Sequence, residues 1–243
     1  MIRLDKFLST VGAATRREAA AAAGRGEIAV DGVPVRRADV HIDPETQTVS
    51  LRGTVIPYRR CRYILLEKPA GVVSATESGN DPTVLDLLPP VMKKLGLFPC
   101  GRLDKNTTGL VLMTNDGPLA HRLLAPKSHV EKDYTFSTVH PLTEEDVKRL
   151  EDGVLLSPEG AEEKEPFRTK PCRIRMCSPT EGVITLTEGK YHQIKRMMEA
   201  VGTKIVSLRR IRFGPLTEDP ALKDGEWRDL TDEEINALQR ADT

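Results

Sequence analysis

One carboxylate stands on a polar turn between two cations. In "GRLDKNTTGL", Asp104 lies between Arg102 and Lys105, and the turn leads into the apolar run of residues 110–113. An aspartate on a turn usually caps the backbone or forms an exposed ion pair. The alternative is a catalytic carboxylate that nearby cations keep ionised, so that it can attack a nucleic acid. The spacing of these residues alone leaves both interpretations open.

Several common chemistries lack their sequence signatures. The chain contains no GxxxxGK[ST], GxGxxG, GxSxG or HExxH pattern, so nucleotide hydrolysis, dinucleotide redox, serine-esterase and zinc-protease functions lose their usual support. The four cysteines form no CxxC pair, and no histidine lies near the closest two, Cys172 and Cys177. Structural zinc normally requires tighter ligand spacing. We therefore expect reduced, ordinary cysteines and no bound metal.

Three stretches together resemble the motifs of the pseudouridine synthases. They are "EKPAGVVSA", "GRLDKNTTGL" and "EGKYHQIKRM", in that order along the chain. The middle stretch matches the family signature GRLDxxTxGL at every specified position. The Tyr-His-Gln form of the third is most similar to enzymes that modify small-subunit ribosomal RNA. The resemblance extends over almost the entire chain, and three ordered motifs are a far more specific signal than one aspartate on a turn.

The resemblance implies a role for each central residue. It makes Asp104 the catalytic carboxylate, Lys195 the cation that faces it, and Tyr134 the active-site tyrosine. Arginine is also common at the cation position, so lysine is a mild departure that lacks the bidentate fork. The reaction breaks the uridine N1–C1′ bond, turns the base and rejoins it through C5. It involves no redox step or hydrolysis, so we expect no cofactor. Attack on C1′ and removal of the C2′ proton are both open to the carboxylate.

The resemblance also suggests residues that touch the RNA. Arg102 occupies the position of an arginine that fills the gap left by a flipped nucleotide. We expect His192 and Arg196 to contact RNA and Lys68 to shape the wall of the cleft. Arg196 follows Lys195 on a predicted helix, so it should project about 100° away from it and share its role less readily.

The elements that must position these residues follow from residue periodicity. Runs of strands with inserted helices predict an α+β domain with a mixed, mostly antiparallel sheet. We expect a buried strand directly after the Asp104 turn and an alternating strand that carries Tyr134. A helix from Lys190 to Gly202 should carry Lys195, and a final strand should follow it. Further expected elements are helices at 118–126 and 143–154, a helix broken by Pro89-Pro90, and paired strands at 173–178 and 182–189.

The first part of the chain predicts a separate small α+β module. Residues 3–12, "RLDKFLSTVG", have apolar residues at helical spacing, and Gly12 can end that helix. Thr15 and Glu18 form a capping-box pattern at the start of a second helix. Two short strands around Asp31-Gly32 predict a tight hairpin.

This order of elements resembles the S4 RNA-binding domain, which has an α-L-like fold. We expect residues 1–57 to form this domain with its linker, and residues 58–243 to form the synthase domain. The cations that we expect to contact RNA in this domain are Arg3, Lys6, Arg16 and Arg17.

The net charge of zero hides an uneven distribution. Residues 1–60 contain ten Lys or Arg against seven acids, and residues 188–212 contain seven against two. Acids collect instead at 151–165 and beyond residue 216. This segregation favours a protein with one cationic face for a polyanion.

Taken together, the sequence predicts an enzyme that converts a uridine of small-subunit (16S) ribosomal RNA to pseudouridine. Its partner would be ribosomal RNA or a ribosome-assembly intermediate, and we expect a monomer. No apolar run approaches the roughly 18 residues of a membrane span, and the N-terminus has no secretory signal, so we expect a cytoplasmic protein. Two alternatives stay open: the same chemistry on large-subunit (23S) RNA, and a non-catalytic RNA-binding or ribosome-assembly protein.

Overall fold

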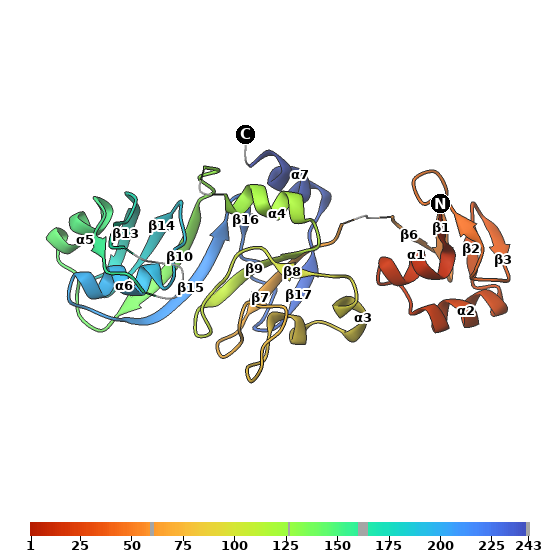
Figure 1. Ribbon diagram of the computed structural model, residues 1–243, viewed down its shortest axis with the longest axis horizontal. Coiled ribbons are helices and arrows are strands. Elements are labelled where there is room, and N and C mark those ends of the chain that lie inside the picture. Colours follow the sequence, from red (N-terminus) through yellow and green to blue (C-terminus); the bar gives the residue numbers. More distant parts are fainter. Residues whose placement is uncertain (59–60, 126, 160–164, 242–243) are drawn as a thin grey trace. The chain divides into compact units, whose positions relative to one another are not determined.

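A computed structural model describes residues 1–58, 61–125, 127–159 and 165–241. The chain forms two compact units (Figure 1). Unit 1 contains residues 1–62 with 85–98 and 114–116, and unit 2 contains 63–84, 99–113 and 117–243. None of the helices among the described residues is long and apolar enough to cross a membrane.

Unit 1 begins with the two predicted helices, α1 (Leu4–Thr10) and α2 (Arg16–Arg25). The capping box at the start of α2 is confirmed, because Thr15 and Glu18 each bond the other's backbone N–H. The helix ends at Gly26, whose φ of 75° is easily reached only by a residue without Cβ.

The hairpin predicted around Asp31-Gly32 is also confirmed, and it belongs to a four-stranded sheet. The strands follow the order β3-β2-β5-β6: β3 (Val33–Val35), β2 (Ile28–Val30), β5 (Val49–Leu51) and β6 (Thr54–Ile56). A second pair joins β1 (Ile2–Arg3) to β4 (His41–Ile42). The end of the segment expected to form the S4 domain with its linker contains β6, which pairs with β5. Arg59 and Arg60 lie outside the described residues.

Unit 2 is built around a mixed, mostly antiparallel sheet, as the sequence predicts. Its strands follow the order β13-β14-β10-β15-β9-β7-β17, with β16 beside β15 and β8 beside β9. β15 pairs with β9 in parallel and with β10 in antiparallel orientation. The bounds are β7 (Tyr63–Lys68), β8 (Phe98–Pro99), β9 (Thr108–Thr114), β10 (Lys132–Thr138), β13 (Arg173–Ser178), β14 (Glu181–Leu186), β15 (Ile205–Phe213), β16 (Leu216–Thr217) and β17 (Trp227–Asp229). A short pair, β11 (Leu155–Leu156) and β12 (Phe167–Arg168), stands apart from this sheet.

The helical elements that accompany the sheets are mostly those that the sequence predicts. They are η1 (Val84–Leu87), α3 (Pro90–Lys93), α4 (Gly117–Leu124), α5 (Glu144–Glu151), α6 (Gln193–Ala200) and α7 (Asp232–Arg240). The break at Pro89-Pro90 separates η1 from α3. The strand β17 and the helix α7 were not predicted.

The start of α6 is a correction. We expected a helix from Lys190, but His192 has a left-handed backbone with φ of 49°, so α6 begins only at Gln193. This conformation is uncommon outside glycine and costs conformational energy. Residues 190–192 therefore form a turn whose side chains are aimed differently from those of a continuous helix.

Candidate active site

The Asp104 turn joins β8 to β9 at the core of unit 2. The backbone N–H of Thr107 donates to the carbonyl of Asp104 at 3.0 Å and closes the turn. Gly109, which follows it, has φ of 101°, and a Cβ there would lie 2.2 Å from the carbonyl oxygen of Arg210 on β15. The glycine of the GRLDxxTxGL pattern therefore allows β9 to lie close against β15 directly after the turn.

The buried side chain of Lys68 stabilises this turn through hydrogen bonds. The Lys68 ammonium donates to the carbonyls of Lys105 at 3.1 Å, Thr107 at 2.7 Å and Pro69 at 3.0 Å, and the residue is fully buried. Burial lowers the pKa of Lys68 to about 8, although the negative charge of Asp104 acts in the opposite direction. We expected Lys68 to contact RNA on the cleft wall. This expectation is wrong, because its charged group is used by backbone carbonyls inside the protein.

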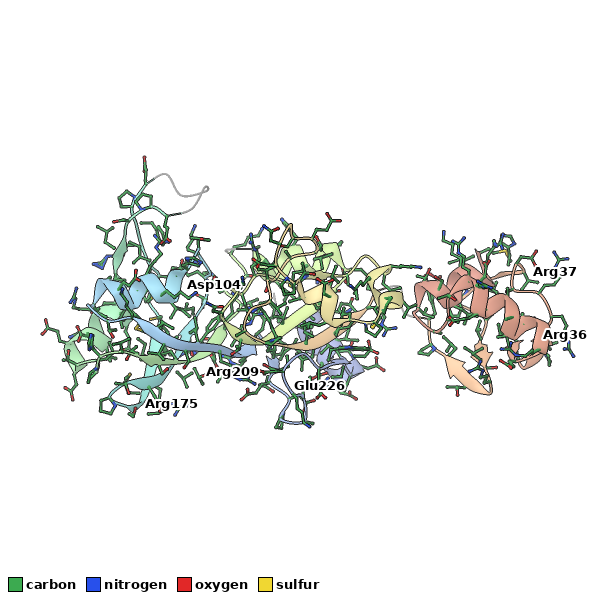
Figure 2. The ribbon with its side chains drawn as sticks, turned by 90° about the horizontal axis from the view of Figure 1, so that it is seen from below. Arg36, Arg37, Asp104, Arg175, Arg209 and Glu226 are labelled. Carbon is green, nitrogen blue, oxygen red and sulfur yellow. The ribbon has the colours of Figure 1, made fainter. Side chains whose placement is uncertain are left out.

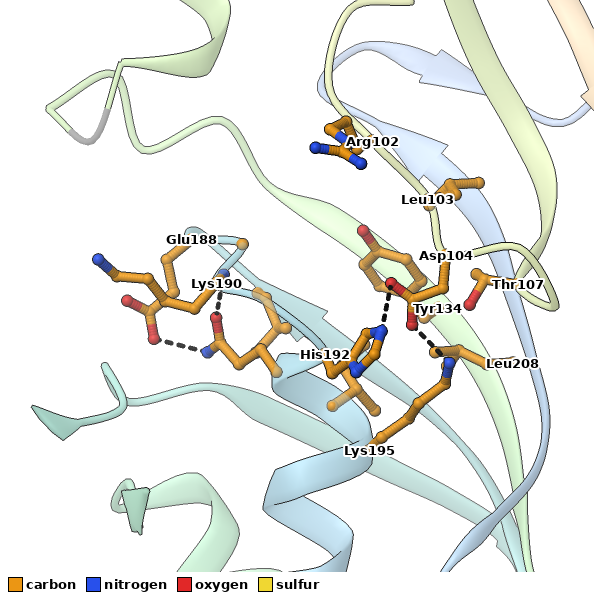
Figure 3. A pocket seen from close by; sticks show the side chains of 14 residues that line it. Arg102, Leu103, Asp104, Thr107, Tyr134, Glu188, Lys190, His192, Lys195 and Leu208 are labelled. Atoms are coloured by element: carbon orange, nitrogen blue, oxygen red, sulfur yellow. Dashed lines mark hydrogen bonds and ion pairs between the residues drawn. The ribbon is translucent and has the colours of Figure 1, made fainter. Parts of the chain in front are cut away.

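Two side chains from the α6 region face the two oxygens of Asp104 (Figure 3). The ammonium Nζ of Lys195 lies 2.5 Å from Oδ2, and Nε2 of His192 lies 3.7 Å from Oδ1. Asp104 keeps 26% of its side chain exposed, so it is partly, not fully, withdrawn from water. Lys195 lies in the first turn of α6, and His192 is the residue directly before this helix.

The cations next to Asp104 in sequence do not pair with it among the described residues. Lys105 lies 2.7 Å from Asp81 instead. Arg102 is exposed and lines the same pocket as Asp104, where Figure 3 shows it apart from the carboxylate. The interpretation of Asp104 as a surface ion pair with its neighbours therefore does not describe the observed contacts.

Tyr134 extends from β10 into the pocket beside Asp104 (Figure 3). The residue is only 8% exposed, and its hydroxyl makes no hydrogen bond within the described part of the chain. Apolar side chains complete this part of the lining: Leu103, Leu186, Ile194 and Leu208. A ring with a polar tip above apolar walls suits a flat ligand that is itself partly polar.

The comparisons with known proteins identify the family. Residues 62–200 match the model for RNA pseudouridylate synthases, and residues 2–47 match the model for the S4 domain. The chain belongs to the pseudouridine synthase family. It is an enzyme of the isomerase class, with an N-terminal S4 domain.

Named relatives and a solved structure agree with this family. The synthase is 43% identical over 241 residues to the uncharacterized RNA pseudouridine synthase YtzG of Bacillus subtilis, with 98% of each chain covered. It is 39% identical to ribosomal small subunit pseudouridine synthase A of Escherichia coli K12, covering 98% of this chain and 100% of the relative. A crystal structure of a pseudouridylate synthase matches with a TM-score of 0.67 and 34% identity, over 98% of this chain and 100% of that one.

Arg196 of the synthase is buried, contrary to our expectation that it would contact RNA. The residue is 7% exposed. Its guanidinium donates to the carbonyls of Tyr191 at 2.8 Å and of Ser157, and it lies 5.4 Å from the Phe167 ring centroid. Arg196 therefore fixes the turn before α6 to the neighbouring β11–β12 pair. The expected divergence of Arg196 from Lys195 agrees with these contacts.

In unit 1 of the synthase, the predicted RNA-binding cations differ in their surroundings. Lys6 on α1 and Arg16 and Arg17 at the start of α2 are exposed. Arg3 is paired with Asp5 through two hydrogen bonds of 2.7 and 3.1 Å. An arginine already engaged in this way is less available to a phosphate.

A different arginine, Arg37, forms a comparable pair with Asp39 at 2.6 Å. The side chains of Arg36 and Arg37 project outward from this unit in Figure 2.

Sequence reasoning missed the role of Gln193 beside the pocket. Gln193, which is 4% exposed, donates to Glu188 at 2.6 Å and accepts from the backbone N–H of Lys190 at 2.8 Å, so it fixes the turn that enters α6. The hydroxyl of Thr107 is buried without a hydrogen-bond partner in the described residues, although Thr107 lines the pocket. The sequence predicts that this hydroxyl bonds the turn backbone and so fixes Asp104, and for the described residues that prediction is wrong.

Among the described residues, no cluster of three His, Cys, Asp or Glu side chains is arranged to hold a metal ion. The four cysteines are free thiols, and burial raises the pKa of Cys100 to about 11.

Proposed function

We propose that the protein isomerises one uridine of small-subunit (16S) ribosomal RNA to pseudouridine, with Asp104 as the catalytic carboxylate. The observation that carries this proposal is the contact between Lys195 and Asp104 in a pocket that Tyr134 also lines. The small-subunit target is supported by the relatives named ribosomal small subunit pseudouridine synthase A.

The two oxygens of Asp104 have different surroundings, which suggests that they have different roles in the reaction. Oδ2 is engaged by the ammonium of Lys195. Oδ1 faces His192 at 3.7 Å, which is too long for a hydrogen bond. Oδ1 is therefore the oxygen available to the nucleotide. It can either attack C1′ or accept the C2′ proton, and both routes break the N1–C1′ bond and release the uracil from the ribose.

Tyr134 would then act on the released base. Its ring can stack on the uracil while the base turns to present C5 to C1′. The new C5–C1′ bond leaves a proton on C5 that must be lost, while N1, freed from C1′, gains a proton from solvent. The Tyr134 hydroxyl, which makes no hydrogen bond within the described residues, would relay the C5 proton to solvent. Atoms balance without any co-reactant, because the product is an isomer of the substrate.

Exposed side chains of both units would bind the RNA strand. Arg102 is exposed and unpaired within the described residues, so it can fill the gap that a flipped nucleotide leaves. Lys6, Arg16 and Arg17 of the S4 domain would contact phosphates. His192 lies beside Asp104, where a nucleotide would also contact it.

The target can be tested by mapping pseudouridine in ribosomal RNA of cells with and without this protein. Loss of one pseudouridine in 16S RNA, restored by the wild-type gene and not by Asp104→Asn, is the expected result. Loss confined to 23S RNA would show that the chemistry is right and the target wrong. Unchanged maps of both RNAs, together with an inactive purified protein, would favour the non-catalytic RNA-binding alternative.

A further inference from the structure

One aromatic ring differs from the others in this chain. The sequence contains ten Phe, Tyr and Trp residues, and all ten are described. Tyr191 alone among them is exposed, at 51%, whereas the other nine are buried or half-buried. It lies between Lys190 and His192, both of which line the Asp104 pocket. An exposed ring between two residues of a pocket lining needs an explanation other than core packing.

The Tyr191 ring is held in place by its neighbours. It stacks on the His192 imidazole with a centroid distance of 3.8 Å and an interplanar angle of 26°. Its carbonyl accepts a hydrogen bond from the buried guanidinium of Arg196. His192 in turn lies between Asp104 and Glu159, at 3.7 and 3.6 Å. One face of the Tyr191 ring is therefore covered by His192, and the ring is ordered before any ligand arrives.

A ring that is already ordered and half exposed is suited to stacking. When a flat ligand stacks on this ring, little additional side-chain motion is restricted, and the entropic cost of binding is therefore low. The exposed cations nearby, Lys190 and Arg102, favour a ligand that carries negative charge next to a flat apolar group. An unpaired nucleotide of RNA has this combination, and bases in single strands are commonly bound by stacking on aromatic side chains.

We propose that Tyr191 is a stacking platform for an unpaired nucleobase that neighbours the target uridine in the strand. This inference rests on the proposed function, because it assumes that the Asp104 pocket receives a nucleotide. The flipped uridine would enter the pocket while the adjacent base stays outside and stacks on Tyr191. The platform would add affinity without reading the identity of that base, since every base has a flat face.

The test compares two ring-directed variants of the full chain on two nine-nucleotide probes. One probe is oligouridylate, and the other has the same backbone with abasic riboses throughout. We expect Tyr191→Leu to weaken binding of oligouridylate about 5- to 100-fold and to leave binding of the abasic probe unchanged. Tyr191→Phe keeps the ring and should bind both probes as the wild type does. Val206→Ala, which truncates another exposed apolar side chain, serves as the matched control.

Each outcome of this test bears on the platform. Equal weakening on both probes would mean that Tyr191 supports the backbone contacts or the fold, and it would overturn the proposal. Unchanged oligouridylate binding by Tyr191→Leu, with a wild-type melting temperature, would also overturn it. A wild-type protein that binds oligouridylate through Tyr191 but isomerises no uridine in ribosomal RNA would instead count against the proposed function alone.

Discussion

The ammonium of Lys195 lies 2.5 Å from Oδ2 of Asp104, although the two residues are far apart in the sequence. This contact identifies the cation that pairs with Asp104. The neighbouring cations Arg102 and Lys105 form no pair with the carboxylate in the described residues, and the positive charge comes from a helix elsewhere in unit 2. The turn therefore directs the Asp104 carboxylate to Lys195 and to the pocket.

The first prediction concerns this ion pair. Lys195→Met removes the positive charge but keeps a long side chain, and we expect kcat to fall by about 10²- to 10³-fold. Lys195→Arg keeps the charge and should retain more activity than Lys195→Met. The measurement is tritium release from ribosomal RNA that contains [5-³H]uridine, with RNA affinity measured in parallel. Equal activity of Lys195→Met and the wild type would rule out an electrostatic role for Lys195.

A second prediction separates the ring of Tyr134 from its hydroxyl. Tyr134→Phe keeps the ring that faces the pocket, so RNA affinity should be unchanged, whereas kcat should fall about 10²- to 10⁴-fold if the hydroxyl moves a proton. Tyr134→Leu removes the ring as well and should also raise KM. Full activity of Tyr134→Phe would mean that the hydroxyl is not needed and that Tyr134 contributes only by stacking.

A third prediction uses the buried ammonium of Lys68. Its pKa is about 8 in the folded protein and near 10.5 in the unfolded chain, so between these pH values the unfolded chain binds more protons. The free energy of unfolding should therefore gain a contribution from Lys68 as the pH rises from about 8 to about 10, by roughly 1.4 kcal/mol per pH unit at most.

Urea titrations of the wild type and Lys68→Met across this range isolate the effect. The difference between the two proteins should shift in favour of the wild type as the pH rises. Lys132, whose pKa burial also lowers to about 8, is present in both proteins and cancels in the comparison. A difference that stays constant with pH would show that the ammonium is not strongly desolvated.

A fourth prediction concerns the orphan hydroxyl of Thr107. A buried hydroxyl without a partner costs about 1–3 kcal/mol, so Thr107→Val should leave the free energy of unfolding unchanged or raise it. Thr107→Ala removes the methyl group as well and should destabilise the protein. Urea unfolding of both variants checks this. A marked loss of stability in Thr107→Val would mean that the hydroxyl has a partner in solution.

The fifth prediction tests the S4 surface. Neutralising Lys6, Arg16 and Arg17 together to Gln should weaken RNA binding and lower the slope of log K against log salt by about 2, because each phosphate contact on single-stranded RNA contributes about 0.7. The matched control is Arg37→Gln, since Arg37 already pairs with Asp39. An unchanged slope in the triple variant would place the RNA contacts elsewhere.

Local patterns predicted much of the fold because the forces involved are local. The capping box at Thr15 and the hairpin at Asp31-Gly32 require contacts between residues a few positions apart. The strand after Asp104 was recognisable in the sequence because its central residues, 110–113, are all apolar, and in the structure they are buried. By contrast, Asp104 and Lys195 could be paired in advance only through the family resemblance, since no local rule links a turn to a distant helix.

The errors in the site have a common physical origin. Lys68 and Arg196 were assigned to the RNA-binding cleft through the family resemblance, but tertiary packing encloses both and engages them with backbone carbonyls. The left-handed backbone of His192 could not be anticipated, because the helical pattern continues smoothly through it. The Tyr191–His192 stack depends on that same backbone and was missed for the same reason.

The most direct test of the account is the activity of Asp104→Asn on ribosomal RNA labelled with [5-³H]uridine. The substitution keeps the size of the side chain and removes its charge and basicity. The account predicts that the wild type releases tritium and forms pseudouridine, whereas Asp104→Asn binds the RNA with similar affinity and releases none. Tritium release by Asp104→Asn at the wild-type rate would contradict the central role of this carboxylate.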